Sequence, residues 1–249
     1  VVVQLGVEAI QGLLSAGVIP VGKHFPGHGN TSVDSHLDLP VLPHSMERLN
    51  RVELKPFRAA IAAGIPAIMT AHIAFQAIDP ERPATLSDKV LQGLLRHKLG
   101  FQGLILTDCM EMAAIGKNPG TVRGAVLALK AGADMVLVSH TRELQVAAYE
   151  AVLAAVRSGE LAESRLDESV QRILAAKRNF SVPNPLPAEE ATRREFWALS
   201  SESHLASITV VKDDGHLLPL RKTSAEPRTA EQCAQRPSLS SSSPTGEPL

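Results

Sequence analysis

Apolar and polar positions alternate in a regular way along the first 178 residues of the chain. Short apolar runs, which predict buried strands, occupy residues 17–21, 66–70, 103–107 and 134–138. Helical periodicity covers residues 3–16, resumes at 46 with Pro56 opening a second helical piece, and returns over 87–98, 121–131, 142–157 and 164–178. Strand, loop and helix in repeated succession predict an α/β fold with parallel strands and helical crossovers.

The number of strands limits the architecture. An eight-stranded TIM-type (β/α)8 barrel takes roughly 250 residues, whereas the four strands expected here already use about 178 residues of this chain. The arithmetic leaves two possibilities, half of such a barrel or a small open sheet.

The composition of the sequence changes after Phe180. Residues 181–187 are a proline-rich linker, 189–207 have helical character, and 208–211 predict a strand. Serine, proline and charge dominate 221–249, a composition that predicts disorder. We therefore divide the chain into a barrel portion (1–180), a linker with the truncated start of a second α/β domain (181–220), and a tail (221–249). The chain opens on Val1 without an initiator methionine, so we expect it to be a fragment.

Composition narrows the possible partners. Twenty-five Lys and Arg balance 26 Asp and Glu, so nucleic acid and anionic membranes are poor partner predictions. No apolar run approaches the roughly 20 residues that membrane insertion needs. The two cysteines provide neither a disulfide framework nor zinc spacing. The cellular compartment stays open.

The loops that follow the predicted strands hold the candidate chemistry. In parallel α/β folds the active site lies beyond the carboxyl ends of the strands, and the loops there contain six of the nine histidines. The richest is Lys23 to His36, which includes His24, His28 and Asp34. Asp34 and His36 are two residues apart, so in extended backbone they point to the same side and can form an acid/base dyad. We expect His28 to order the loop rather than to contact a ligand.

The second candidate site follows the apolar run 103–107. Asp108 stands where a carboxylate is costly unless it is paired or used, and the competing interpretation is a helix N-cap. Glu111 is the other carboxylate of this loop, but we expect it to cap a turn. Cys109 lies beside a carboxylate whose negative charge disfavours a reactive thiolate, so we interpret it as a packing residue. His72, at another strand end, either lines the site or is hydrogen-bonded below it.

A metal-dependent barrel hydrolase is the rival enzyme class. Its ligands would come from the set His24, His28, His36, His72 and Asp108. Such a site needs at least three of these side chains to converge at metal distances. An inactive fragment is the rival that is not an enzyme, because four strands leave two unpaired sheet edges.

The motifs resemble glycoside hydrolase family 3, in its β-N-acetylhexosaminidase branch. Lys23-His-Phe-Pro-Gly-His-Gly29, followed by Asp34-Ser-His36, resembles the central motif of that branch, and Leu106-Thr-Asp108 its nucleophile motif. Residues 165–174 resemble the last barrel helix, and residues 208–219 the opening of the second domain. Asn30 departs from the pattern, since many relatives have Asp there.

The resemblance implies a role for each matching residue. Asp108 would be the nucleophile of a retaining mechanism, and His36 the general acid/base supported by Asp34. Lys23 and His24 would contact sugar hydroxyls, with His72 also lining the substrate site. The substrate would be a small glycoside ending in N-acetylglucosamine, such as a peptidoglycan fragment, and no metal or other cofactor is implied. Because the earlier barrel strands are missing, we expect the isolated chain to have little activity.

Overall fold

The computed structural model describes residues 1–31, 35, 37–180 and 194–215. The chain divides into two compact units, Val1–Pro185 and Leu186–Leu249, which are described separately. The first unit contains both candidate sites that the sequence predicts.

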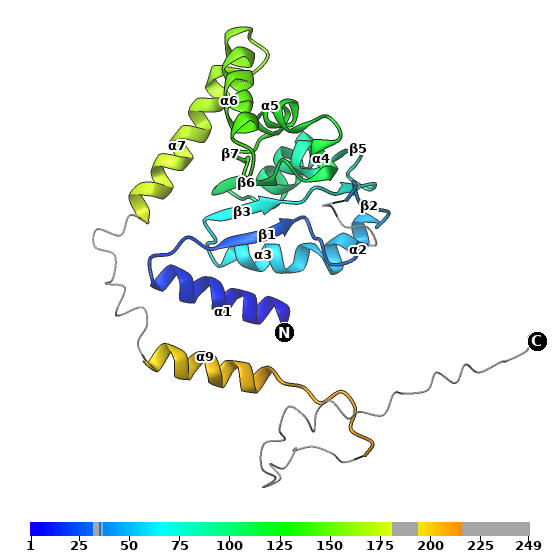
Figure 1. The fold of residues 1–249 in the computed structure, drawn as a ribbon, viewed down its shortest axis with the longest axis vertical. Coiled ribbons are helices and arrows are strands. Elements are labelled where there is room, and N and C mark those ends of the chain that lie inside the picture. Colours follow the sequence, from blue (N-terminus) through cyan, green and yellow to red (C-terminus); the bar gives the residue numbers. More distant parts are fainter. Residues whose placement is uncertain (32–34, 36, 181–193, 216–249) are drawn as a thin grey trace, which may run out of the picture. The chain divides into compact units, whose positions relative to one another are not determined.

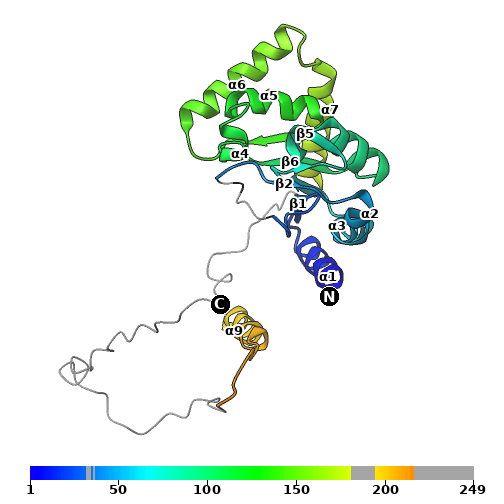
Figure 2. The same ribbon diagram turned by 90° about the vertical axis from the view of Figure 1, so that its right-hand side faces the viewer.

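A four-stranded parallel sheet forms the centre of the first unit. Its strands are β1 (Val21–Phe25), β3 (Ala67–Thr70), β6 (Leu104–Cys109) and β7 (Met135–Leu137). They are ordered β1-β3-β6-β7, and each neighbouring pair is parallel. The predicted α/β class with a parallel sheet is therefore confirmed. In both views α1 and α3 lie near β1, and α6 lies beside α5 (Figures 1 and 2). Helix α5 also contacts β7.

Helices connect these strands. They are α1 (Val2–Ser15), α2 (Met46–Arg51), α3 (Leu54–Ala62), the short 3₁₀ helix η1 (Ala84–Leu86), the π-type helix η2 (Lys89–Lys98), α4 (Ala113–Gly116), α5 (Thr121–Ala131), α6 (Arg142–Arg157) and α7 (Glu163–Asn179). The bounds of α5 and α6 are those that the sequence predicts. Pro56 is the third residue of α3 rather than its first, because that helix already begins at Leu54.

Local sequence signals explain several helix ends. Ser45 caps α2 by accepting the backbone N–H of Arg48. Helix α5 ends at Gly132, which has a φ of 119° and lets the chain turn directly into β7. Gly17, with a φ of 73°, ends α1 in the same way.

The first strand is not where its apolar run predicts it. The run 17–21 predicts the strand, but β1 begins at Val21 and ends at Phe25. Gly17 closes α1 through backbone hydrogen bonds to Leu14, and Val18 beyond it is 48% exposed. Residues 17–19 therefore belong to the connection between α1 and β1 and not to the strand. As a result Lys23 and His24 lie within the strand and not in the loop after it.

A second, three-stranded sheet was not predicted. It consists of β2 (Val41–Leu42), β4 (Ala74–Phe75) and β5 (Asp79–Pro83). Strands β2 and β4 are only two residues long, which is too short to produce a recognisable periodicity. This sheet ties the loop after β1 to the loop after β3 through the parallel pair β2 and β4.

The described part of the second unit is the helix α9 (Arg194–Ser207) and the residues up to 215. The strand predicted over 208–211 is not formed, and the side chains of Ile208, Val210 and Val211 are exposed. A strand gains its backbone hydrogen bonds only by pairing. The predicted tail 221–249 lies outside the described residues. Among the helices described in both units, none has the length and apolar character needed to cross a membrane.

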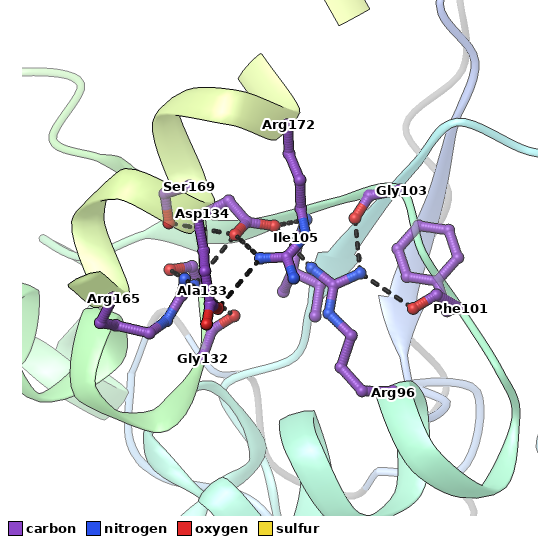
Figure 3. Close-up of polar contacts among 11 residues, drawn as sticks. Arg96, Phe101, Gly103, Ile105, Gly132, Ala133, Asp134, Arg165, Ser169 and Arg172 are labelled. Carbon is purple, nitrogen blue, oxygen red and sulfur yellow. Dashed lines mark hydrogen bonds and ion pairs between the residues drawn. The ribbon is translucent and has the colours of Figure 1, made fainter. Parts of the chain in front are cut away.

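One buried carboxylate joins the sheet to helix α7 at the start of β7. Asp134 Oδ2 accepts hydrogen bonds from Arg96 Nη2 at 2.6 Å and from the Ile105 backbone N–H at 3.0 Å (Figure 3). Its Oδ1 accepts from Arg165 at 2.9 Å, and from Ser169 and Arg172 at 3.0 Å each. This network connects η2, β6, β7 and α7, so Asp134 has a structural role.

Removing this carboxylate is expected to destabilise the first unit strongly. Asp134→Ala leaves the buried Arg96 guanidinium without its counter-ion, and the loss of one partner from a buried ion pair costs about 3–5 kcal/mol. The measurement is the free energy of unfolding from urea titration. Asp88→Ala is the matched control, since its pair with Arg82 is exposed and should contribute less than about 1 kcal/mol. Equal losses in the two variants would show that the Asp134 network does not hold the unit together.

Candidate active site

Asp108 is the next-to-last residue of β6, at the carboxyl end of the parallel sheet. Its side chain is 23% exposed, so the carboxylate is accessible but sheltered. Burial raises the pKa of Asp108, but the hydrogen bond from His24, the Cys109 backbone N–H at 2.7 Å and the nearby imidazoles outweigh it and lower the pKa to about 2. Asp108 is therefore ionised at neutral pH, the state that a carboxylate nucleophile requires.

The N-cap interpretation of Asp108 is wrong. The next helix, α4, begins at Ala113, and its N-cap position is Met112. Asp108 instead bonds to the backbone N–H of its own neighbour and to a histidine on another strand. The carboxylate is thus held in place without serving a helix end.

His24 lies directly against Asp108. Its Nε2 atom is 3.2 Å from Asp108 Oδ2, and its side chain is 24% exposed. Strand β3 separates β1 from β6 in the sheet, so this contact joins side chains of two strands that are not neighbours. Lys23 precedes His24 on β1. The structure therefore brings His24 and Asp108 together, a pairing that the sequence did not predict.

Polar side chains contact one another among the described residues of the long loop after β1. His28 lies 3.4 Å from the hydroxyls of both Thr31 and Ser35, and its ring contacts that of His24 edge-on. Asn30 Nδ2 lies 2.9 Å from His44 Nε2. The contacts of His28 with Thr31 and Ser35 are consistent with the loop-ordering role expected for it.

The predicted dyad, Asp34 and His36, lies outside the described residues. The residues on either side of His36 are described, and both contact the segment that follows Asp108. The Ser35 carbonyl accepts the Ala114 backbone N–H at 3.2 Å, and the Leu37 carbonyl accepts from Lys117 Nζ at 2.7 Å. The role of Lys117 was missed, because a lysine in an exposed loop carries no sequence signal for such a contact.

His72 follows the end of β3 and is buried within the protein. Its side chain is buried, with the whole residue 1% exposed. The Nε2 atom is 3.0 Å from the Cys109 carbonyl, and Nδ1 is 2.8 Å from the Thr85 hydroxyl. Both ring nitrogens are thus engaged by protein groups, which corresponds to the second of the two arrangements considered for this residue. Contact between His72 and a sugar stays a prediction.

Glu111 forms hydrogen bonds with the segment that precedes helix α6. Its carboxylate accepts the backbone N–H groups of His140 at 2.7 Å and Thr141 at 3.1 Å, immediately before α6. Hydrogen bonds from Thr141 and His140 lower the pKa of Glu111 to about 2. The expectation that Glu111 caps the turn that follows it is wrong, because its carboxylate instead accepts from the two residues that precede α6.

The metal-site alternative gains no support from the described residues. Within residues 1–31, 35, 37–180 and 194–215, no three His, Cys, Asp or Glu side chains converge as a metal site would need. His24 and Asp108 form a pair, while both nitrogens of His72 are already engaged.

A parallel sheet that presents an ionised carboxylate and histidines at its carboxyl edge is the arrangement of an α/β enzyme. The sequence model of the glycosyl hydrolase family 3 N terminal domain matches residues 1–176. The chain belongs to glycoside hydrolase family 3, in the branch that contains the β-N-acetylhexosaminidases. The resemblance seen in the sequence motifs is confirmed.

Individual relatives agree with this assignment. Beta-hexosaminidase A of Pseudoalteromonas piscicida is 35% identical over 246 residues, an alignment that covers 89% of this chain and 40% of that protein. The structure of a family 3 β-N-acetylglucosaminidase from Paenibacillus sp. str. FPU-7 is 53% identical, with a TM-score of 0.73, over 75% of this chain and 36% of that one. The β-N-acetylglucosaminidase of Thermotoga maritima is 35% identical, with a TM-score of 0.67, over 73% of this chain and 39% of that one. The chain spans about 40% of the length of the curated relatives that it matches.

Proposed function

We propose that this chain is the C-terminal half of the (β/α)8 barrel of a retaining exo-β-N-acetylhexosaminidase, followed by the start of a second domain. Its substrate is a terminal N-acetylglucosamine on a peptidoglycan fragment or a similar small glycoside. The relatives named β-hexosaminidase and β-N-acetylglucosaminidase support this substrate class. The low aromatic content, 3%, favours a small end-on sugar site over a long stacked cleft.

The observation that carries the proposal is the ionised, partly exposed Asp108 carboxylate at the carboxyl edge of the sheet. In the first step a carboxylate oxygen of Asp108 attacks the anomeric carbon, while His36 gives its proton to the departing glycosidic oxygen. In the second step His36 takes a proton from water, the hydroxide attacks the anomeric carbon, and the Asp108 carboxylate leaves. Asp34 supports the imidazolium form of His36, which donates the proton in the first step and is formed again in the second.

The contacts that flank His36 support its assignment as the acid/base. Ser35 and Leu37 hydrogen-bond to Ala114 and Lys117, in and directly after α4. That helix begins five residues after Asp108 in sequence. The backbone that carries His36 is therefore attached to the segment that carries the nucleophile. Lys23 and His24 are assigned to sugar hydroxyls, with His24 close enough to Asp108 to contact both.

A chimera tests the function. Residues 1–176 of this chain replace the corresponding segment of the Paenibacillus family 3 β-N-acetylglucosaminidase, so that Asp108 and His36 come from this chain and the rest of the barrel from the relative. The chimera should hydrolyse an aryl β-N-acetylglucosaminide and release the sugar first as its β-anomer, as seen by proton NMR. It should leave the matched aryl β-glucoside largely intact. A folded chimera that releases the α-anomer first, or that prefers the glucoside, would contradict the proposal.

A further inference from the structure

A buried chain of hydrogen bonds leads from Thr70 to the backbone carbonyl of Cys109, the residue that follows Asp108. The Thr70 and Thr85 hydroxyls are 2.7 Å apart, Thr85 Oγ1 is 2.8 Å from His72 Nδ1, and His72 Nε2 is 3.0 Å from the Cys109 carbonyl. Thr70, His72 and Thr85 are each at most 1% exposed. Burying four polar groups in this way is costly unless each has a partner.

The chemistry of the partners sets the direction of the protons. The Cys109 carbonyl can only accept, so His72 Nε2 carries a proton. Burial lowers the pKa of His72, and the nearby His24 and His28 lower it further. The Cys109 carbonyl and Asp108 raise the pKa but do not outweigh burial, so at neutral pH the ring is neutral and Nδ1 has a lone pair. The lone pair of a neutral Nδ1 can only accept, so in this tautomer the Thr85 hydroxyl donates to His72 Nδ1. The Ala71 carbonyl, 3.0 Å from the same hydroxyl, is the other acceptor within its reach.

The sheet holds the backbone at Cys109 on one side only. Cys109 is paired with Leu137 of β7, after a register shift that follows Leu106, whereas the paired register of β3 and β6 ends at Met69 and Leu106. His72 lies two residues beyond the end of β3, on the side of β6 where the backbone pairing with β3 has ended. Cys109 also donates its N–H to Asp108 Oδ1 at 2.7 Å.

We propose that His72 is a positioning residue for Asp108, and that it acts by holding the Cys109 carbonyl so that the Cys109 N–H stays directed at Asp108 Oδ1. The chain Thr70, Thr85, His72 and Cys109 thereby sets the orientation of the carboxylate at the strand end. This inference rests on the proposed role of Asp108 as the nucleophile. It assigns His72 to the backbone and not to the sugar.

Two substitutions distinguish positioning from simple core packing, measured on the complete 249-residue chain. Glutamine places its amide N–H₂ near the position of Nε2 and can still donate to the Cys109 carbonyl, whereas asparagine places its amide near the position of Nδ1 and cannot. Carbon-13 NMR of labelled aspartate follows the Asp108 carboxyl, identified by its absence in Asp108→Asn. His72→Asn should raise the pKa of Asp108 from about 2 toward its ordinary value near 3.9, and His72→Gln should leave it low. The exposed His97→Asn is the control, expected to change nothing.

The wild-type chain supplies a second measurement that needs no variant. Nitrogen-15 NMR of the imidazoles should show His72 as the neutral Nε2–H tautomer at neutral pH, and as still mostly neutral at about pH 6.5, the ordinary histidine pKa. An Nδ1–H tautomer, a doubly protonated ring at neutral pH, or an equal response of Asp108 to both His72 substitutions would overturn the inference. In the chimera His72→Asn should lower kcat by about 10²-fold with little change in KM. An inactive chimera with the expected NMR results would refute the proposed function and leave this inference standing.

Discussion

Asp108→Ala is expected to abolish hydrolysis of an aryl β-N-acetylglucosaminide by the chimera. Without the carboxylate no glycosyl-aspartate can form, and a methyl group offers no replacement nucleophile. Asp108 suits this role because it is ionised and 23% exposed. The measurement is kcat/KM for the variant and the parent chimera, together with a thermal melt to confirm that both are folded.

Glu111→Ala is the matched control for the nucleophile. Glu111 is also ionised at neutral pH and lies three residues after Asp108, but its oxygens accept the His140 and Thr141 N–H groups. Most of the turnover should therefore remain in this variant, with some loss of thermal stability where α6 begins. A mechanism-based fluorosugar should add the mass of one sugar to the peptide that contains both carboxylates, and fragmentation should place it on Asp108. Labelling at Glu111, or full activity of Asp108→Ala, would show that the nucleophile has been misassigned.

His36→Ala is expected to slow hydrolysis by roughly 10² to 10⁴-fold, the range for loss of a general acid/base. The size of the loss should depend on the leaving group. A dinitrophenolate leaves without being protonated, so its first step should be nearly normal, whereas an alkyl or sugar leaving group needs the proton. The measurement is kcat/KM for a series of N-acetylglucosaminides with leaving groups of increasing pKa.

His44→Ala is the control for His36. His44 belongs to the same region of the chain and lies 2.9 Å from Asn30, but no catalytic step is assigned to it. Its replacement should leave the leaving-group dependence unchanged. A uniform loss across the whole series for His36→Ala would indicate that the residue positions the loop and does not transfer a proton.

Local patterns were sufficient for much of the fold. Helices α5 and α6 have the bounds that their periodicity predicts, because each buries one face and ends at residues suited to a helix terminus. The four parallel strands appear in chain order because each apolar run is followed by a crossover helix. The first strand was misplaced since Gly17 and Val18 belong to the exit from α1, and an apolar run by itself does not show where a turn ends.

The sequence by itself determined the parallel α/β class, the family, and Asp108 as the candidate nucleophile, because a carboxylate after an apolar strand and a set of ordered motifs are local features. Only the tertiary structure decided which side chains meet: His24 with Asp108, His72 with the Cys109 carbonyl, Glu111 with the start of α6, and Asp134 with three arginines. The partners in each of these contacts come from different strands or helices. Their distance depends on strand order, register and side-chain direction, which periodicity along one segment does not contain.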